Sequence, residues 1–170
     1  MLNYIDTSIL REMSTRLTYD KQTGFVFWLD GKKAGCRVTN VSPDGYLRLK
    51  LLGKSYYLHR VAWFLYYGVW PEGYLDHING DKTDNRVENL RLATSSQNSA
   101  NRLKAVNNTA GFKGVCYNKN HRKFLARVGA NPRINIGYFT TVEDAAKAYN
   151  KSALEMYGEF AKLNKIEEPQ

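Results

Sequence analysis

Residues 76–98 read DHINGDKTDNRVENLRLATSSQN, a polar, turn-rich stretch that concentrates hard-metal ligands and proton-transfer groups. Asp76 offers a carboxylate oxygen and Asn98 an amide oxygen, which suit Mg²⁺ or Mn²⁺ better than thiophilic metals. Residues 94–97 have the form of a capping box, which predicts that Asn98 lies in the first turn of a helix. A strand ending at Asp76 and His77 could face that helix, with the two side chains on opposite sides of the strand. One of them could then hold a cation while the other addresses a water molecule.

Spacing alone leaves a simpler interpretation of this stretch open. A DH dipeptide followed by Asn-rich turns is more often a plain loop than a site, and Asp81, Asp84 and Asn85 are most simply turn formers. His59 begins an apolar helix, where packing explains it better than catalysis does. His121 lies in a basic turn, and we assign it no catalytic role. Only one of the three histidines is therefore a candidate proton acceptor.

The charge of the chain is unevenly distributed. Its 170 residues include 25 Lys and Arg against 16 Asp and Glu, a formal net charge of +9. No Asp or Glu occurs between Asn89 and Val142, and aromatic residues are interleaved with the positive charges there. These positive charges are Arg91, Arg102, Lys104, Lys113, Lys119, Arg122, Lys123, Arg127 and Arg133. Such a stretch favours a polyanion as partner, and nucleic acid over a merely solvated surface.

The composition excludes several classes of protein. With 43% hydrophobic residues the chain can form a core, which excludes wholesale disorder. No apolar run approaches the roughly 20 residues of a membrane helix, and the N-terminus lacks the pattern of a secretory signal. Cys36 and Cys116 lie far apart and form no CxxC pair, which argues against a zinc knuckle or a disulfide framework. We therefore expect a cytoplasmic protein without a membrane partner.

Composition and periodicity divide the chain into segments. These are a β-rich N-terminal region (1–58), a central unit (59–102), a linker (103–110), a C-terminal module (111–164) and a tail (165–170). The first region opens with a possible short helix around Thr7–Leu17, and the central unit begins with apolar residues at helical spacing. In the C-terminal module a helix is expected after the N-cap Thr141. The strands expected before it are Gly111–Val115, Phe124–Val128 and Asn135–Phe139.

The central unit resembles the HNH (ββα-metal) endonuclease family. The residues that carry the resemblance are His59–Trp63, Trp70–Gly73, Asp76–Asp81, Asp84–Arg86, Glu88–Arg91, Thr94 and Gln97–Asn98. The resemblance implies that His77 is the general base that activates water, and that Asp76 and Asn98 bind one divalent cation, Mg²⁺ or Mn²⁺. It also implies that Asn89 braces the loop through hydrogen bonds and helps to orient His77. The expected products have 5′-phosphate and 3′-hydroxyl ends.

The C-terminal module resembles the AP2 (AP2/ERF-type) DNA-binding domain. The matching positions are Gly111–Val115, Lys123–Phe124, Ala126, Ile136–Phe139, Thr141, Glu143, Ala145–Ala146, Ala148–Tyr149, Gly158 and Ala161–Asn164. The resemblance implies a sheet in the DNA major groove, with Lys113, Phe124 and Arg127 on or beside the DNA face and Lys119, Arg122 and Lys123 near phosphates. Cys116 and Asn118 stand where plant members have guanine-contacting arginines, and Phe124 replaces their tryptophan. Phosphate affinity is therefore expected, while the base preference stays open.

Together these features predict an α+β fold. A β-rich N-terminal region leads into a ββα-metal unit, and a three-stranded antiparallel sheet packed on one helix follows. The predicted function is a metal-dependent, homing-like endonuclease acting on double-stranded DNA, encoded by a phage and located in the host cytoplasm. Two alternatives stay open: a DNA-binding transcriptional regulator whose HNH unit is only a scaffold, and an RNA-binding or RNA-processing protein. The sequence also leaves open which DNA sequence is the target and whether one strand or both are cut. The oligomeric state stays open too, and a monomer is one possibility.

Overall fold

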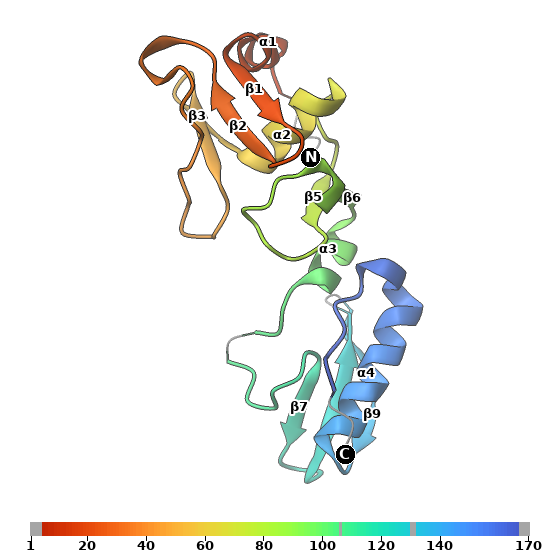
Figure 1. Cartoon of the computed structure of the whole chain (residues 1–170). Helices are drawn as coiled ribbons and strands as arrows, with labels where there is room; N and C mark the ends of the chain where they lie inside the picture. The colour runs from red at the N-terminus through yellow and green to blue at the C-terminus, as the bar shows by residue number, and fades with distance from the viewer. Residues whose placement is uncertain (1–4, 106, 130–131, 167–170) are drawn as a thin grey trace. The chain divides into compact units, whose positions relative to one another are not determined.

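The chain folds into two compact units, which are described separately. The computed structural model describes residues 5–105, 107–129 and 132–166. The first unit comprises residues 1–94 and the second residues 95–170 (Figure 1). The linker and the tail expected from the sequence each include residues outside the described ranges. No helix within those ranges is long and apolar enough to cross a membrane.

The described part of the first unit is built from three separate antiparallel strand pairs and two α-helices. The pairs are β1 (Leu17–Asp20) with β2 (Phe25–Trp28), β3 (Arg48–Leu51) with β4 (Lys54–Tyr57), and β5 (Tyr74–His77) with β6 (Leu90–Ala93). The helices are α1 (Thr7–Arg16) and α2 (Leu58–Tyr67), and two 3-10 turns are η1 (Gly31–Lys33) and η2 (Val87–Asn89). The expected combination of small antiparallel sheets and helices is thus confirmed.

One hydrophobic core holds α1, α2 and the first two strand pairs together. Met13 of α1, Val26 of β2 and Val61 of α2 are completely buried in it. Each side chain of this kind contributes about 1.5–3 kcal/mol by leaving water. The third strand pair, β5 and β6, follows this packed core in the same unit.

Local contacts fix where β5 begins. Helix α2 ends at Gly68, whose φ of 73° is the left-handed conformation typical of a helix C-terminus, and its N–H bonds to Phe64. The Arg60 guanidinium then donates to the backbone oxygens of Pro71 at 2.5 Å and Gly73 at 2.8 Å. The connection between α2 and β5 is therefore held by hydrogen bonds to the helix that precedes it.

The second unit contains a three-stranded antiparallel sheet and a long helix. Its described elements are α3 (Ser95–Asn101), β7 (Val115–Asn118), β8 (Lys123–Val128), β9 (Ile134–Phe139), α4 (Val142–Tyr157) and η3 (Gly158–Phe160). The strand order is β7-β8-β9, and α4 packs on the sheet with Ala145 and Ala146 against Val115 and Ala126, and with Tyr149 against Val128. Small residues let the helix approach the sheet closely.

Strand β7 begins later than the sequence predicts. The expected strand was Gly111–Val115, whereas the observed one is Val115–Asn118. Gly111 and Gly114 have φ values of 82° and 75°, which lie outside the extended region, so the chain enters the sheet only after them. The prediction is wrong here because both glycines adopt positive φ angles, which are incompatible with an extended strand.

Helix α3 belongs to the second unit rather than to the strand pair that precedes it. The Lys162 N–H donates to Ala100 O at 3.1 Å, and the Lys113 ammonium donates to Arg102 O at 2.6 Å and also to Ala100 O. These bonds tie α3 and its C-terminal end to the sheet unit. The two compact units therefore meet in sequence at residues 94 and 95, and the expected linker at 103–110 stays a prediction. The sequence order β5, β6, α3 is the one expected for a ββα unit, and its assembly in space stays a prediction.

Candidate active site

His77 is buried at the end of β5 and is held by an asparagine. Its side chain is 4% exposed, and its Nε2 lies 3.1 Å from the Oδ1 atom of Asn85, which is itself 1% exposed. An amide oxygen can only accept, so this pair requires the proton on Nε2. That tautomer puts the basic lone pair on Nδ1. Asn85, expected to be a simple turn former, therefore contacts the imidazole directly.

Asp76 precedes His77 and forms a buried ion pair with Arg91 on the neighbouring strand. The register of β5 with β6 sets the two residues opposite each other. The Nε and Nη2 atoms of Arg91 lie 3.1 Å and 3.0 Å from Oδ2 of Asp76, and the two side chains are only 12% and 6% exposed. The guanidinium thus compensates the desolvation of the carboxylate and fixes its rotation. From the sequence alone, Arg91 is only one of the cations of the basic stretch.

Asn89 braces the loop between β5 and β6. Its Oδ1 accepts from the Asn79 N–H at 3.0 Å, and its Nδ2 donates to Asn79 Oδ1 at 3.0 Å and to Asp84 O at 2.8 Å. Its own carbonyl accepts from Ile78 N–H at 2.9 Å. These bonds join both ends of the loop that contains Asn85. They agree with the bracing expected for Asn89, while its part in the chemistry stays a prediction.

The N-terminal strand pair supports the same loop from outside. The Tyr19 hydroxyl of β1 donates to Asn85 O at 3.1 Å and accepts from Val87 N–H at 3.0 Å. Gly24, at the turn before β2, lies so close that a Cβ there would meet Arg86 N at 2.4 Å. Both contacts join residues more than 60 positions apart, so no local pattern could have indicated them. The region 1–58 therefore positions the backbone of Asn85.

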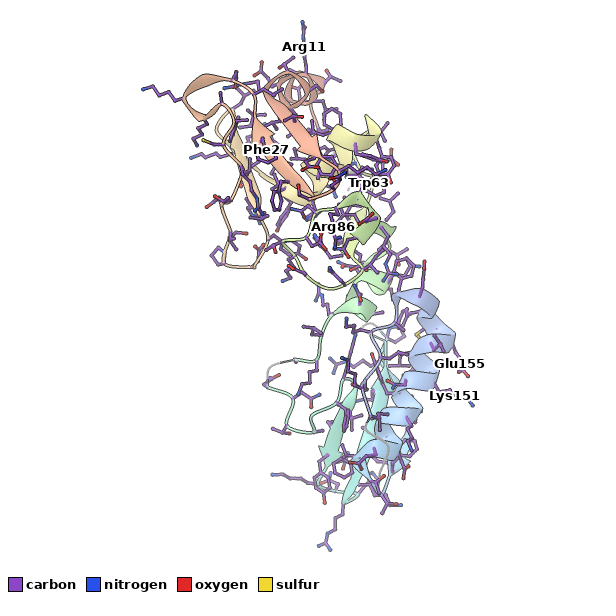
Figure 2. All side chains as sticks on the ribbon, in the orientation of Figure 1. Arg11, Phe27, Trp63, Arg86, Lys151 and Glu155 are labelled. Atoms are coloured by element: carbon purple, nitrogen blue, oxygen red, sulfur yellow. The ribbon has the colours of Figure 1, made fainter. Side chains whose placement is uncertain are left out.

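Arg86 holds the outer side of this loop. Its guanidinium pairs with Asp84 at 2.7 Å and with Glu88 at 3.3 Å, and Figure 2 labels it between the strand pairs of the first unit. Asp84 in turn accepts from Asn79 Nδ2 at 2.9 Å. The loop is thus tied by side-chain bonds on its exposed as well as its buried side.

A second buried histidine packs against His77. The ring centroids of His59 and His77 are 5.1 Å apart, and Tyr46 contacts both rings, with centroids at 5.3 Å and 5.8 Å. His59 Nδ1 has no hydrogen-bond partner within the described residues. Tyr57 stacks on the His59 ring at 5.4 Å. These aromatic contacts agree with the packing role expected for His59 at the start of α2.

Both imidazoles are neutral near pH 7. Burial lowers the pKa of His59 to about 3, and electrostatic interactions of a protonated His59 with His77 and Arg60 add to this effect. Burial also lowers the pKa of His77, against the opposite effect of its bond to Asn85 and of nearby carboxylates such as Asp76. A neutral imidazole can accept a proton, so His77 is competent as a base at physiological pH.

The remaining candidate residues lie in the second unit. Asn98 is in α3, away in sequence from Asp76, so the meeting of the two oxygens stays a prediction. Lys119, Arg122 and Lys123 are exposed at the turn between β7 and β8. No group of three or more His, Cys, Asp or Glu side chains able to hold a metal occurs among the described residues.

The residues expected at the DNA face do not share one side of the sheet. Phe124 packs with the core under α4, and its ring contacts Tyr117 at 5.3 Å between centroids. A β-bulge separates Arg127 from Ala126, but the Arg127 Nη2 donates to Sγ of Cys116 at 3.0 Å, and Cys116 lies on the face opposite the buried Val115. The Lys113 ammonium lies on the carbonyls at the end of α3. The DNA contacts of these three residues stay predictions, and packing explains Phe124 and Lys113 already.

Comparisons with known proteins find similarity to HNH endonucleases. A family model described as HNH endonuclease matches residues 56–100. The chain is 39% identical over 118 residues to an uncharacterized HNH endonuclease of Acanthamoeba polyphaga mimivirus, covering 68% of this chain and only 60% of that protein. It is 32% identical over 107 residues to Protein 3.8 of Escherichia phage T7, covering 62% of this chain and 88% of that protein. No solved structure matches the chain at a significant level.

Proposed function

This chain belongs to the HNH endonuclease family, and from that premise we propose that it hydrolyses phosphodiester bonds of double-stranded DNA. The observation that carries the proposal is the buried, neutral His77, whose tautomer is set by Asn85 at 3.1 Å. In this proposal Nδ1 of His77 takes the proton of the attacking water. Asn89 keeps the loop in place while the proton moves.

The proposed cation ligands fit a hard divalent metal. Asp76 supplies a carboxylate oxygen and Asn98 an amide oxygen, which are the donors that Mg²⁺ and Mn²⁺ prefer. Such a cation, when bound, would neutralise the charge that develops on the phosphate and on the leaving 3′ oxygen. Arg91 holds Asp76 Oδ2 and so orients the carboxylate before any cation is present. The products of this chemistry would be 5′-phosphate and 3′-hydroxyl ends.

The second unit would bind the DNA target. Its support is the acid-free basic stretch, together with Arg127 on the sheet face opposite α4 and three exposed cations in the β7–β8 turn. An AP2-like use of the sheet in the major groove and a homing-like choice of target are part of this proposal. Phosphate contacts position a protein on DNA, whereas base contacts specify the sequence, so the two parts can be measured separately.

The first test is cleavage of supercoiled plasmid with Mg²⁺, Mn²⁺ or EDTA. We expect wild-type protein to cut only with a cation, and His77→Ala to cut about 10²–10⁴-fold more slowly because the base is gone. His121→Ala is the matched control, since His121 is an exposed histidine outside the site. Binding of the same DNA in EDTA should be equal for all three proteins.

Two results would contradict the proposal. Wild-type protein that binds DNA tightly but never cuts it would favour the transcriptional regulator with an inert HNH scaffold. A preference for structured RNA over duplex DNA, in competition at one salt concentration, would favour the RNA-processing alternative.

A further inference from the structure

The second unit contains a cavity of about 380 Å³ that the proposed active site does not use. One wall is formed by the C-terminal end of α3 with the residues that follow it, and another by Gly114, Val115 and Cys116 at the start of β7. Tyr149 and Tyr157 of α4 close a further side. The whole lining lies within residues 99–157, inside a single unit.

The charge of this cavity is entirely positive. No Asp or Glu occurs among its described lining residues. The basic side chains that line it are Arg102, Lys104, Lys113, Arg127 and Arg133. Five cations around one cavity repel each other unless an anion sits among them, so the lining favours a negatively charged ligand.

Two of these cations are held in place by bonds to the protein. The Lys113 ammonium donates to the carbonyls of Ala100 and Arg102, and so neutralises the negative end of α3 next to the cavity. The Arg127 guanidinium is fixed by its bond to Cys116 Sγ at 3.0 Å. Arg102, Lys104 and Arg133 are exposed, which leaves them able to reach a ligand larger than the cavity.

The wall beside β7 is also rigid. Asn108 Nδ2 donates to Phe112 O at 2.8 Å and to Val115 O at 3.3 Å, and its Oδ1 accepts from Gly111 N–H at 3.1 Å. These bonds shape residues 108–115 into a closed turn. A cavity bounded by bonded backbone and fixed cations needs little reorganisation to bind an anion.

We propose that this cavity binds a phosphate group of the DNA backbone, next to the phosphate that is cleaved. The inference rests on the proposed function in one respect, the assignment of Asn98 as a cation ligand. Ser99 and Ala100, directly after Asn98, already line the cavity, and a helix rises only about 1.5 Å per residue. A phosphate held here would therefore belong to the same DNA molecule as the one at Asn98. Arginine suits this task because its planar guanidinium can donate two bonds to one phosphate.

A polymer explains the surroundings better than a single small anion does. The exposed cations Lys119, Arg122 and Lys123 lie in the same unit, and the sequence of this stretch carries no acid to offset them. A free phosphate would engage only the cavity, whereas a DNA backbone can engage the cavity and the turn together. We therefore assign the cavity to the backbone.

The salt dependence of DNA binding tests the proposal in EDTA, where cleavage plays no part. The triple variant Arg102→Gln, Lys104→Gln, Arg133→Gln removes three lining charges. The control Lys147→Gln, Lys151→Gln, Lys165→Gln removes three exposed charges of the same unit that do not line the cavity. Lys151 lies on the outward side of α4, beside Glu155 (Figure 2). Both variants change the net charge equally.

We expect the cavity variant to bind duplex DNA at least about tenfold more weakly. Its slope of log affinity against log salt should fall by about 0.9 for each lost phosphate contact. In the control variant, the DNA affinity and the salt slope should both fall much less. An equal loss in both variants would overturn the proposal, since charge alone would then explain the binding. If the protein does not cut DNA but the two variants still differ in this way, the proposed nuclease function is refuted and the proposed phosphate-binding cavity is supported.

Cys116 provides a second measurement at the cavity itself. In a Cys36→Ser background the remaining thiol lines the cavity, so its alkylation by iodoacetamide reports whether the cavity is filled. Duplex DNA should slow the alkylation, and the same concentration of inorganic phosphate should not. Equal protection by inorganic phosphate would reassign the cavity to a free anion, and alkylation unchanged by DNA would refute the site.

Discussion

His59 and His77 meet ring to ring in the interior, yet their environments give them different tasks. His77 has a partner for one ring nitrogen in Asn85, whereas His59 has a buried Nδ1 without a hydrogen bond in the described structure. An unpaired polar atom costs free energy of about 1–3 kcal/mol when it is buried. The site therefore keeps a second imidazole next to the base at a cost in stability.

At this residue scale the acid sensitivity of the fold can be predicted. The pKa of His59 is about 3 in the folded protein and about 6.5 when unfolded, so below pH 6.5 the unfolded chain binds the extra proton. Stability should therefore fall with decreasing pH, by about 1.4 kcal/mol per pH unit between pH 6 and 4 from this group.

Urea unfolding at a series of pH values measures this slope. In His59→Gln, the slope of the unfolding free energy against pH should decrease by the amount that corresponds to about one proton. His121→Gln should leave this slope unchanged because His121 is exposed. An unaltered slope in His59→Gln would show that other groups cause the acid sensitivity.

At the scale of elements, the β1–β2 pair acts on the active-site loop from a distance in sequence. The Tyr19 hydroxyl bridges the backbone of Asn85 and Val87, and Gly24 makes room for the backbone at Arg86. Asn85 in turn holds His77. Through these contacts the N-terminal region supports the loop that holds His77. Neither the composition of the region nor its strand pattern indicates this.

Replacing the bridging hydroxyl tests that role. Tyr19→Phe should lower kcat about tenfold with little change in KM, because the loop loses its register while the DNA contacts of the second unit persist. Its cost in stability should be about 1 kcal/mol, followed by thermal unfolding. Tyr66→Phe is the control, since Tyr66 contacts the Tyr19 ring at 6.2 Å but is itself 41% exposed. A kcat equal to that of the wild type would remove Tyr19 from the positioning of His77.

At the scale of the whole molecule, the hydrophobic core is split. The buried cluster of α1, α2 and the first strand pairs lies within residues 1–94, and the clusters under α4 lie within 95–170. The predicted catalytic base and one cation ligand belong to the first unit, and the other cation ligand belongs to the second. The proposed activity therefore depends on two separately stabilised parts.

A substitution in one core should affect one unit alone. A Cβ at Gly114 would lie 2.1 Å from the Tyr149 ring and 2.6 Å from Arg127 O, at a φ of 75°. Gly114→Ala should therefore destabilise the second unit by about 2–5 kcal/mol. Calorimetry should show the unfolding transition of the second unit at a lower temperature and that of the first unit at an unchanged temperature.

Gly111→Ala is the matched control for this experiment. Gly111 has a similar φ of 82° but no atom within 4 Å of the added Cβ, so only the backbone strain of about 1 kcal/mol remains. A Gly114→Ala protein with both transitions shifted equally would show that the units unfold together.

The candidate groups for the chemistry and several helix boundaries could be predicted from the sequence. Asp76, His77 and Asn89 lie on or beside one strand pair, and the resemblance of their motif to the HNH family selected them where spacing alone left a plain loop open. Helix boundaries such as Gly68 and Thr141 follow from local capping, which involves only neighbouring residues.

Which side chains meet across long sequence separations depends on how the elements pack. Asn85 was an expected turn former until the fold set its amide on His77, and Tyr19 reaches it across 66 positions. Phe124 faces the core and Lys113 caps α3, although both looked like DNA contacts. The physical reason is that burial and long-range hydrogen bonding depend on how elements pack, and no local pattern contains that information.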